Sequence, residues 1–417
     1  MEEHRPQISR ELVECEGRTA ESLHEVRCED CLGCSVESKV MRSDLERFVA
    51  EVLGTYGVSG PDAAITARVL VAADLRGIPS HGVARLGRYV KGLRDGYIRP
   101  GVTADVVEPV PAVGVIDAKN GIGQVVSDLA MDLAVSKARA NGVGVVTVRN
   151  SNHFGIAGYY VQKAIDAGMI GVCLTNSAPL VVPTNGADAV LGTNPIAVGA
   201  PGNDGVDFLL DMATSVVPRG KLEVYDRNRR QMPVGWAVDD HGYDSRNPGQ
   251  VLASLVRRAG GGILPLGGRG EEFSGHKGYG LALLVDVLSG VLSGGAFGLD
   301  VDNVNRASAD GSAAPRIGHF FLALDVASFM PLDEFRQRLS ALVSMLKGSR
   351  KALDKTVIYV HGEKERARAR LHEQSGIPLT ENVLSALRRM AAECRVRGPV
   401  TVADRLLRRR PELEEGR

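Results

Sequence analysis

The stretch Val113–Asn150, VGVIDAKNGIGQVVSDLAMDLAVSKARANGVGVVTVRN, decides the fold. Its two valine-rich ends predict strands, and the segment between them predicts a helix that ends at Gly142. The alternation continues at once, with a helical FGIAGYYVQKAIDAG and a strand-like MIGVCLTNS. Alternating helices and strands of this kind predict an α/β or α+β core.

Toward the N-terminus the sequence predicts two helices. Asp44 is expected to cap an amphipathic helix in MRSDLERFVAEVLGTYGV. A second helix is expected to be capped near Ser59 and to run from Pro61 to about Arg76.

Toward the C-terminus the composition of the sequence changes. Residues 179–202 are rich in Pro, Gly and Asn, which predicts strands joined by tight loops. Strands are predicted at FLLDMATS (208–215) and RIGHFFLALDV (316–326), and a buried helix at LALLVDVLSGVLSGG (281–295). An amphipathic helix is expected over Leu332–Lys347.

The composition excludes several classes of protein. Lys+Arg and Asp+Glu both number 50, and a net charge of zero argues against a nucleic-acid binder. No apolar run of about 18 residues occurs, which argues against a membrane span. The polar N-terminus does not resemble a signal peptide. After residue 34 only Cys173 and Cys394 remain, which fits a reducing cytoplasm.

The first forty residues differ from the rest. They crowd together potential metal ligands, namely Cys15, His24, Cys28, Cys31 and Cys34. Zinc or an iron–sulfur centre is one interpretation, although a second CxxC and a trailing Cys-Pro are missing. The favoured interpretation is a disordered extension, or an upstream start with Met41 as the true first residue, and therefore no metal.

Several familiar motifs fail. Gly121-x-Gly123 follows a strand, as in a dinucleotide fingerprint, but Val126 stands where the third glycine belongs. The sequence contains no GxxxxGK[ST] loop, no GxSxG elbow and no HExxH helix. A standard Rossmann site, P-loop phosphoryl transfer, hydrolase chemistry and zinc-protease chemistry are therefore not expected.

The first motif with catalytic potential is SHGVARLGRY, which contains Ser80, His81, Arg85 and Tyr89. A histidine can exchange a proton near pH 7, and an arginine can hold a carboxylate through two hydrogen bonds. In a helix, Arg85 and Tyr89 would share one face. The alternative is a helix-capping Ser-His pair with a solvated arginine.

The second motif is NSNHFG, which places His153 between a buried strand and a helix. Loops at strand ends commonly carry the functional groups of α/β proteins. Asn150 and Asn152 could orient the ring or a bound amide. A helix-capping turn explains the same residues equally well.

Two further segments offer polar groups. Asp211 ends the strand FLLDMATS, where its carboxylate could support an imidazole or cap the next helix. Ser177, Asn185 and Asn194 suit amide recognition or turn bonding. The loop GGRGEEFSGHKGYG, with Lys277, suits a phosphate or a mobile surface loop.

Taken together, SHGVAR, NSNHFG, GTNP, DMATS and GHKGYG resemble, in order and spacing, the malate/L-lactate/ureidoglycolate dehydrogenase family. The resemblance covers roughly residues 41–387. It implies a non-Rossmann fold, in which a mostly antiparallel sheet binds NAD or NADP beside a helical domain built from both chain ends. The implied division is an extension at 1–40, a helical substrate-side domain at 41–110 with 320–390, an NAD(P)-binding domain at 111–319 and a charged tail at 391–417.

The resemblance also implies roles for individual residues. Ser80, His81 and Asp211 would form a relay, His153 is a rival for the direct acid/base, and Arg85 and Tyr89 would bind substrate. The implied cofactor contacts are Ser177, Asp211, Met212, Ala213, His276, Lys277, Gly362 and Glu363. The family's proline before the glycine at position 362 is His361 here, so the sequence departs from the family pattern next to that contact.

The resulting expectation is a cytoplasmic, homodimeric oxidoreductase that binds no nucleic acid or membrane. It would transfer hydride between NAD or NADP and a small 2-hydroxy or 2-keto carboxylate, malate- or lactate-like. Reduction of a cyclic imine carboxylate is the alternative, and a cysteine-cluster regulatory protein is a remote one. The sequence leaves open the substrate, the choice of NAD or NADP, and which histidine transfers the proton.

Overall fold

The computed structural model describes residues 38–203, 206–301 and 314–404. Contacts divide the chain into residues 1–36 and 37–417, and everything below concerns the second unit. The expected metal-binding or disordered extension, with its cysteines, lies outside the described residues, as does the end of the charged tail.

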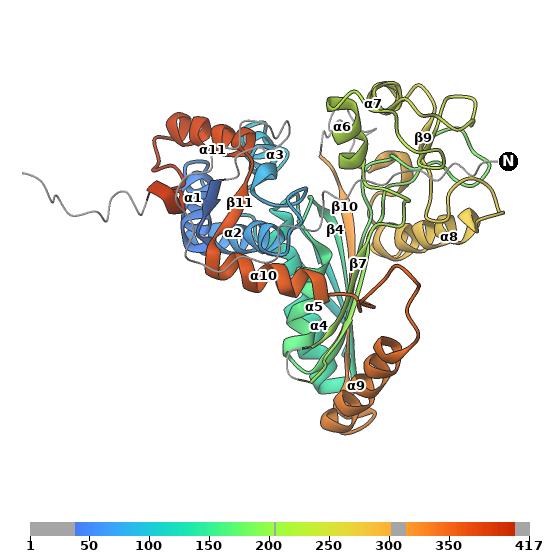
Figure 1. Cartoon of the computed structure of the whole chain (residues 1–417). Helices are drawn as coiled ribbons and strands as arrows, with labels where there is room; N and C mark the ends of the chain where they lie inside the picture. Colours follow the sequence, from blue (N-terminus) through green and yellow to red (C-terminus); the bar gives the residue numbers. More distant parts are fainter. Residues whose placement is uncertain (1–37, 204–205, 302–313, 405–417) are drawn as a thin grey trace, which may run out of the picture. The chain divides into compact units, whose positions relative to one another are not determined.

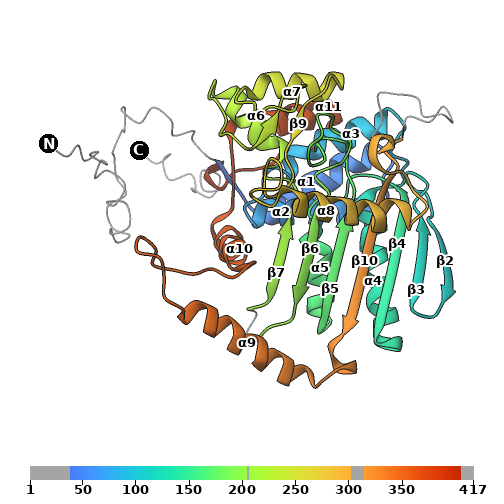
Figure 2. The same cartoon turned by 90° about the vertical axis from the view of Figure 1, so that its right-hand side faces the viewer.

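A seven-stranded sheet forms the centre of this unit (Figures 1 and 2). Its strands, in spatial order, are β2 (Asp105–Val110), β3 (Val113–Asp117), β4 (Val143–Ser151), β10 (Ile317–Asp325), β5 (Met169–Thr175), β6 (Ile196–Ala200) and β7 (Phe208–Met212). Every neighbouring pair is antiparallel except β3 and β4. The predicted mixed fold with a mostly antiparallel sheet is confirmed.

The parallel pair is the segment Val113–Asn150 that decided the fold. Its crossover is α4 (Gly123–Asn141), which ends at Gly142 in a left-handed conformation, as predicted. Small residues let α4 lie close to the sheet, because a Cβ on Gly144 would stand 2.0 Å from the carbonyl oxygen of Ala134. The next helix, α5 (Ala157–Asp166), packs beside α4 on the same face (Figure 2).

Helices from both chain ends share one hydrophobic core. They are α1 (Arg42–Gly54), α2 (Gly60–Leu75), α3 (Leu86–Arg94), α10 (Glu363–Ser375) and α11 (Glu381–Cys394), with β1 (Ser38–Val40) paired to β11 (Ile377–Leu379). Ser59 caps α2 through its hydroxyl, as predicted. The prediction that Asp44 caps α1 is wrong: the helix begins at Arg42, and Asp44 lies in its first turn.

The predicted domain boundary at 319/320 falls inside β10, a central strand of the sheet. A strand cannot leave the sheet halfway without breaking its ladder. The boundary therefore does not coincide with the end of an element, and the division of the chain into domains stays a prediction.

Residues between β7 and β10, with Val181 and Leu191 from the segment before β6, form a smaller hydrophobic cluster at one end of the sheet (Figure 1). Its elements are α6 (Arg219–Arg227), β8 (Ala237–Val238), α7 (Pro248–Arg257), β9 (Gly262–Ile263) and α8 (Gly275–Asp286), which continues as a π-helical turn at Val287–Val291. The prediction of a buried helix at 281–295 is only partly met in the single chain: Val285 is fully buried, whereas most of the other large apolar side chains, including Leu284 and Leu292, are substantially exposed.

The last long element is α9 (Leu332–Gly348), which has no buried residue although its sequence is amphipathic. Among the described residues, none of the helices combines the length and the apolar character needed to cross a lipid bilayer.

Candidate active site

A cavity of about 450 Å³ brings together five of the predicted site residues: Ser80, His81, Arg85, His153 and Ser177. The first three come from the loop and short 3-10 turn between α2 and α3. His153 follows β4, and Ser177 follows β5. Segments separated by up to a hundred residues thus meet at one end of the sheet.

The two histidine rings face each other in this cavity. Their centroids are 5.6 Å apart and the ring planes are inclined by 20°. Two imidazoles at this spacing repel each other if both are protonated, so at most one readily carries a positive charge.

His81 is fixed by its own loop. Its Nδ1 lies 2.9 Å from Ser80 Oγ, and Arg85 Nε donates to the Ser80 carbonyl oxygen at 2.7 Å. Burial, followed by repulsion from Arg85 and Arg88, lowers the pKa of His81 to about 4. His81 is therefore neutral near pH 7 in the free protein.

Asp74 supports this loop from inside the helical core. Its carboxylate accepts a hydrogen bond from the Val83 N–H at 2.7 Å. The loop packs so closely on it that a Cβ on Gly82 would stand 2.0 Å from Asp74 Oδ1. Burial raises the pKa of Asp74 to about 7.

The surroundings of His153 define its tautomer. Tyr89 Oη lies 2.6 Å from Nδ1, and the Gly155 N–H donates to the same nitrogen at 3.3 Å. A backbone N–H can only donate, so Nδ1 carries no proton and the neutral ring is protonated at Nε2. Desolvation, and then repulsion from Arg88, His81 and Arg85, holds the pKa of His153 well below its usual value.

Tyr89 lies against His153 and not on the cavity wall, and its predicted contact with substrate stays a prediction. It is 2% exposed and is not among the residues that line the cavity. Burial raises its pKa to about 12, so its hydroxyl stays protonated and donates to His153.

The asparagines around His153 hold the loop. Asn152 donates to the carbonyl oxygens of Asn120 and Gly121 at 3.1 and 2.8 Å. Asn150 donates to both oxygens of Asp117, at 3.1 and 3.0 Å. These amides are used in loop structure, the role that the sequence left open beside ligand binding.

The predicted cofactor contacts divide into two groups. Ser177 lines the cavity, and its hydroxyl accepts from the Thr193 N–H. Asn194 fixes this segment: its Oδ1 accepts from the Ser177 N–H and its Nδ2 donates to the Ala282 carbonyl oxygen. The other predicted contacts do not line the cavity; they are Asp211, Met212, Ala213, His276, Lys277, Gly362 and Glu363.

Asp211 lies at the end of β7, where Oδ2 accepts from the Gly158 N–H at 2.7 Å. His276 and Lys277 are exposed at the start of α8. Gly362 is the residue before α10, and Glu363 pairs with Lys347 at 2.6 Å. A relay from Ser80 and His81 to Asp211, and cofactor contacts at these positions, stay predictions.

Sequence reasoning missed other residues of the cavity wall. They include Arg88, Thr175, Thr193, Arg219 and Gly220. Arg88 follows Arg85 by three residues, so the helical periodicity that linked Arg85 to Tyr89 could have identified it. Arg219 and Gly220 follow Pro218 at the start of α6, a common position for proline at a helix start.

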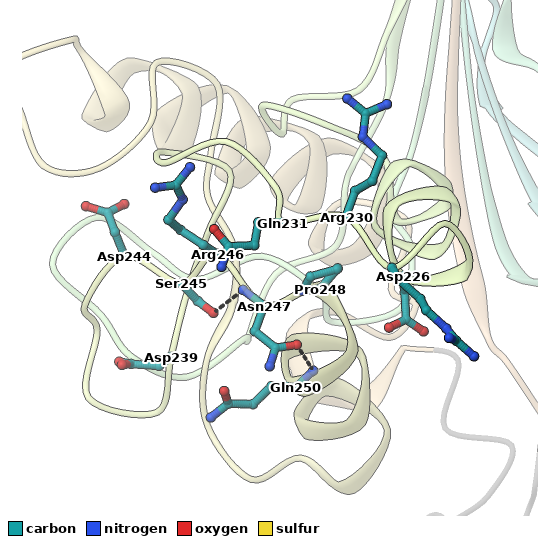
Figure 3. A pocket seen from close by; sticks show the side chains of 11 residues that line it. Asp226, Arg230, Gln231, Asp239, Asp244, Ser245, Arg246, Asn247, Pro248 and Gln250 are labelled. Atoms are coloured by element: carbon teal, nitrogen blue, oxygen red, sulfur yellow. Dashed lines mark hydrogen bonds between the residues drawn. The ribbon is translucent and has the colours of Figure 1, made fainter.

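A second polar hollow lies in the segment from α6 to α7 (Figure 3). Its polar groups make turn and cap bonds: Ser245 Oγ accepts from the Asn247 N–H, and Asn247 Oδ1 accepts from the Gln250 N–H. It contains no histidine and shares no lining residue with the histidine cavity. The histidine cavity is therefore the candidate active site.

Comparisons with known proteins agree with this geometry. The family model for malate/L-lactate dehydrogenase matches residues 40–388. A malate dehydrogenase from Pyrococcus abyssi is 46% identical over 360 residues, covering 86% of this chain and 96% of the relative. An L-sulfolactate dehydrogenase from Methanocaldococcus jannaschii is 38% identical, covering 84% and 95%.

Among solved structures, malate dehydrogenase from Pyrococcus horikoshii OT3 superimposes with a TM-score of 0.78 at 42% identity, covering 87% of this chain and 97% of that one. The agreement spans sheet, helices and cavity motifs rather than one local segment. The chain therefore belongs to the malate/L-lactate dehydrogenase family.

Proposed function

We propose that the cavity transfers hydride between a nicotinamide dinucleotide and a small 2-hydroxy or 2-keto carboxylate. One observation carries the proposal: two stacked imidazoles lie in the same cavity as three guanidinium groups, those of Arg85, Arg88 and Arg219. Imidazoles can exchange the hydroxyl proton, and guanidinium groups can hold carboxylates.

Groups on the cavity wall support binding of a dinucleotide there. The first residues of α6, Arg219 and Gly220, line it together with Pro218. The first N–H groups of a helix have no acceptor within the helix and favour anions, so this end suits a diphosphate. The position of a Cβ on Gly220 has no neighbour within 4 Å, which leaves room there. Ser177 and Thr193 add hydroxyls.

NAD or NADP, when bound, would accept or supply the hydride. The protein's part is proton transfer and orientation. His153, protonated at Nε2 and held by Tyr89, acts as a neutral hydrogen-bond donor to the substrate oxygen. It is a poor proton acceptor, because protonation at Nδ1 would place a hydrogen against the Gly155 N–H.

His81 is then the group that changes its protonation state. In the direction of alcohol oxidation it is neutral near pH 7 and accepts the hydroxyl proton. In the reverse direction it must start protonated. An anionic substrate beside Arg85 and Arg88 offsets the two positive charges that lower its pKa, so substrate binding favours the imidazolium.

The three guanidinium groups favour a substrate with two anionic groups. Arg219 Nε pairs with Glu223 at 2.9 Å, so this pair keeps one donor face of the guanidinium occupied and leaves others for a ligand. The relatives described above are named for malate and sulfolactate, each of which carries two anionic groups. We therefore expect malate or a similar dianion to be used better than lactate.

Two exposed apolar surfaces support a homodimer. On α8 and the turn after it, Leu281, Leu284, Val291 and Leu292 are 37–58% exposed. On α9, Leu342, Met345 and Leu346 are 46–66% exposed. Isolated monomers rarely expose contiguous surfaces of this kind, so we infer that a second copy of the chain covers them. Light scattering on the purified protein tests the mass.

The described cysteines, Cys173 and Cys394, are both free thiols, which supports a cytoplasmic location. This inference about location is independent of the proposed hydride transfer.

A substrate panel tests the function. Malate, lactate, sulfolactate, ureidoglycolate and a cyclic imine carboxylate are each assayed with both NAD(H) and NADP(H). We expect turnover of a dianionic hydroxy acid and its loss in both His81→Ala and His153→Ala. Turnover of the imine alone would favour the alternative reductase function, and unchanged activity in both histidine variants would refute the assignment.

A further inference from the structure

His319 is a buried histidine that the catalytic proposal does not use. It lies near the start of β10, is 0% exposed and does not line the cavity. Nδ1 lies 2.8 Å from Thr175 Oγ1, and Nε2 lies 2.8 Å from Ser151 Oγ. One face stacks on Phe154, with centroids 4.6 Å apart and planes inclined by 2°.

Its partners connect the two halves of the active site. Ser151 is the last residue of β4, two positions before His153. Thr175 is the last residue of β5, two positions before Ser177. Since β10 lies between β4 and β5 in the sheet, the single ring of His319 bridges the two strand ends.

The hydrogen bonds define one protonation state. The Thr175 hydroxyl donates to backbone, with the carbonyl oxygens of Asn176 and Gly318 at 3.0 and 3.1 Å. It therefore accepts from Nδ1–H of His319, which leaves Nε2 unprotonated in the neutral ring and able to accept from the Ser151 hydroxyl; the other acceptor near that hydroxyl, the Asn152 carbonyl oxygen, lies farther away at 3.5 Å. Burial lowers the pKa of His319 to about 3, so the ring stays neutral throughout the working range.

Phe154, on which the His319 ring stacks, connects His319 to His153. Phe154 lines the cavity and directly follows His153. The Tyr160 hydroxyl donates to the Phe154 carbonyl oxygen and so also holds this peptide in place. A change in the His319 ring therefore reaches His153 both through Ser151 and through Phe154.

We propose that His319 is a positioning residue that fixes the placement of His153 relative to the strand end bearing Ser177. The inference rests on the proposed hydride transfer at this cavity. A shift of the His153 ring by a fraction of an ångström misaligns the hydrogen bond to the substrate oxygen, and with it proton and hydride transfer, although the guanidinium groups still bind the substrate.

Three variants of His319 separate positioning from simple stability. His319→Ala removes both hydrogen bonds and the stacking. His319→Gln can place its amide near the Nε2 position, and His319→Asn near the Nδ1 position. The matched control is Val146→Ala on β4, which removes a fully buried side chain from the core that contains Phe154.

Kinetics with malate form the first readout. In His319→Ala we expect kcat to fall by about tenfold to a hundredfold with KM changed much less. We also expect a larger primary isotope effect with 2-deuterated malate, because the hydride step becomes more rate-limiting. His319→Gln or His319→Asn should restore part of kcat. If Val146→Ala lowers kcat as much at equal thermal stability, or if the isotope effect does not rise, the inference is wrong.

Imidazole NMR of the substrate-free protein is the second readout and does not depend on turnover. His319→Ala should shift the ring resonances of His153 well beyond the shift caused by Val146→Ala. If the wild type turns over no hydroxy acid, the proposed function fails while this arm still tests the positioning. If the wild type is active and the resonances of His153 are unmoved, the positioning inference alone is overturned.

Discussion

Tyr89→Phe tests the assignment of His153 as a neutral donor. The substitution removes the hydroxyl 2.6 Å from Nδ1 and leaves only the Gly155 N–H at 3.3 Å. Leaving a buried acceptor without its main donor costs about 1–3 kcal/mol. If this orientation is needed chiefly in the transition state, kcat falls by about 5- to 150-fold, since about 1.4 kcal/mol corresponds to a tenfold change in rate.

The KM for malate should change little, because Tyr89 does not line the cavity. The assay is steady-state malate oxidation with each dinucleotide, beside the matched variant Tyr56→Phe. Tyr56 is a half-buried tyrosine whose hydroxyl contacts the thiol of Cys394, 3.8 Å away in the helical core. A kcat for Tyr89→Phe within about twofold of the wild type, or a matching loss in Tyr56→Phe, would refute the reasoning.

Other substitutions probe the charges around the cavity. Asp74 has a pKa raised to about 7 in the folded protein, so the wild type loses stability as the pH rises from about 4 to 7. Asp74→Asn keeps an acceptor for the Val83 N–H but does not titrate. Urea unfolding should therefore show Asp74→Asn to be about 2–4 kcal/mol more stable than the wild type above pH 7, with no gain near pH 4. Arg88→Gln removes a positive charge that lowers the pKa of His81, so that pKa should rise from about 4, and the acidic limb of kcat/KM for malate oxidation should move to higher pH. At saturating dinucleotide, because the start of α6 that bears Arg219 is also the proposed diphosphate site, Arg219→Leu should raise the KM for malate by about tenfold or more and leave that for lactate nearly unchanged; an equal loss with both substrates under these conditions would contradict a role in binding a second anionic group.

The sequence predicted the elements whose signals are local. Valine-rich strands, the cap at Ser59 and the glycine after α4 are each determined by a few neighbouring residues. Asp44 was misplaced because an acidic residue in the first turn and an N-cap residue give the same sequence pattern at a helix start. The exposure of side chains on α8 could not be predicted from its apolar composition, since apolar residues at a surface and in a core give the same sequence pattern.

The sequence motifs that line the cavity could be predicted, but the contacts between their residues could not. Tyr89 and His153 are 64 residues apart, and His319 and Ser151 are 168 apart. Contacts of this range depend on how strands are ordered in the sheet, and a single sequence does not specify that order.

The failed glycine fingerprint shows how the structure changes the interpretation of a motif. Gly121 and Gly123 follow a strand and precede a helix, the arrangement in which glycines usually admit a phosphate. Here a Cβ on Gly123 would stand 2.3 Å from the carbonyl oxygen of Asn152 and 2.6 Å from that of His153. The glycine is required because the loop that bears Asn152 and His153 packs its own backbone on the first turn of α4. The same turn that would hold a diphosphate in a Rossmann fold therefore holds the His153 loop in this one, and the proposed diphosphate site lies at another helix end that lines the cavity, the start of α6.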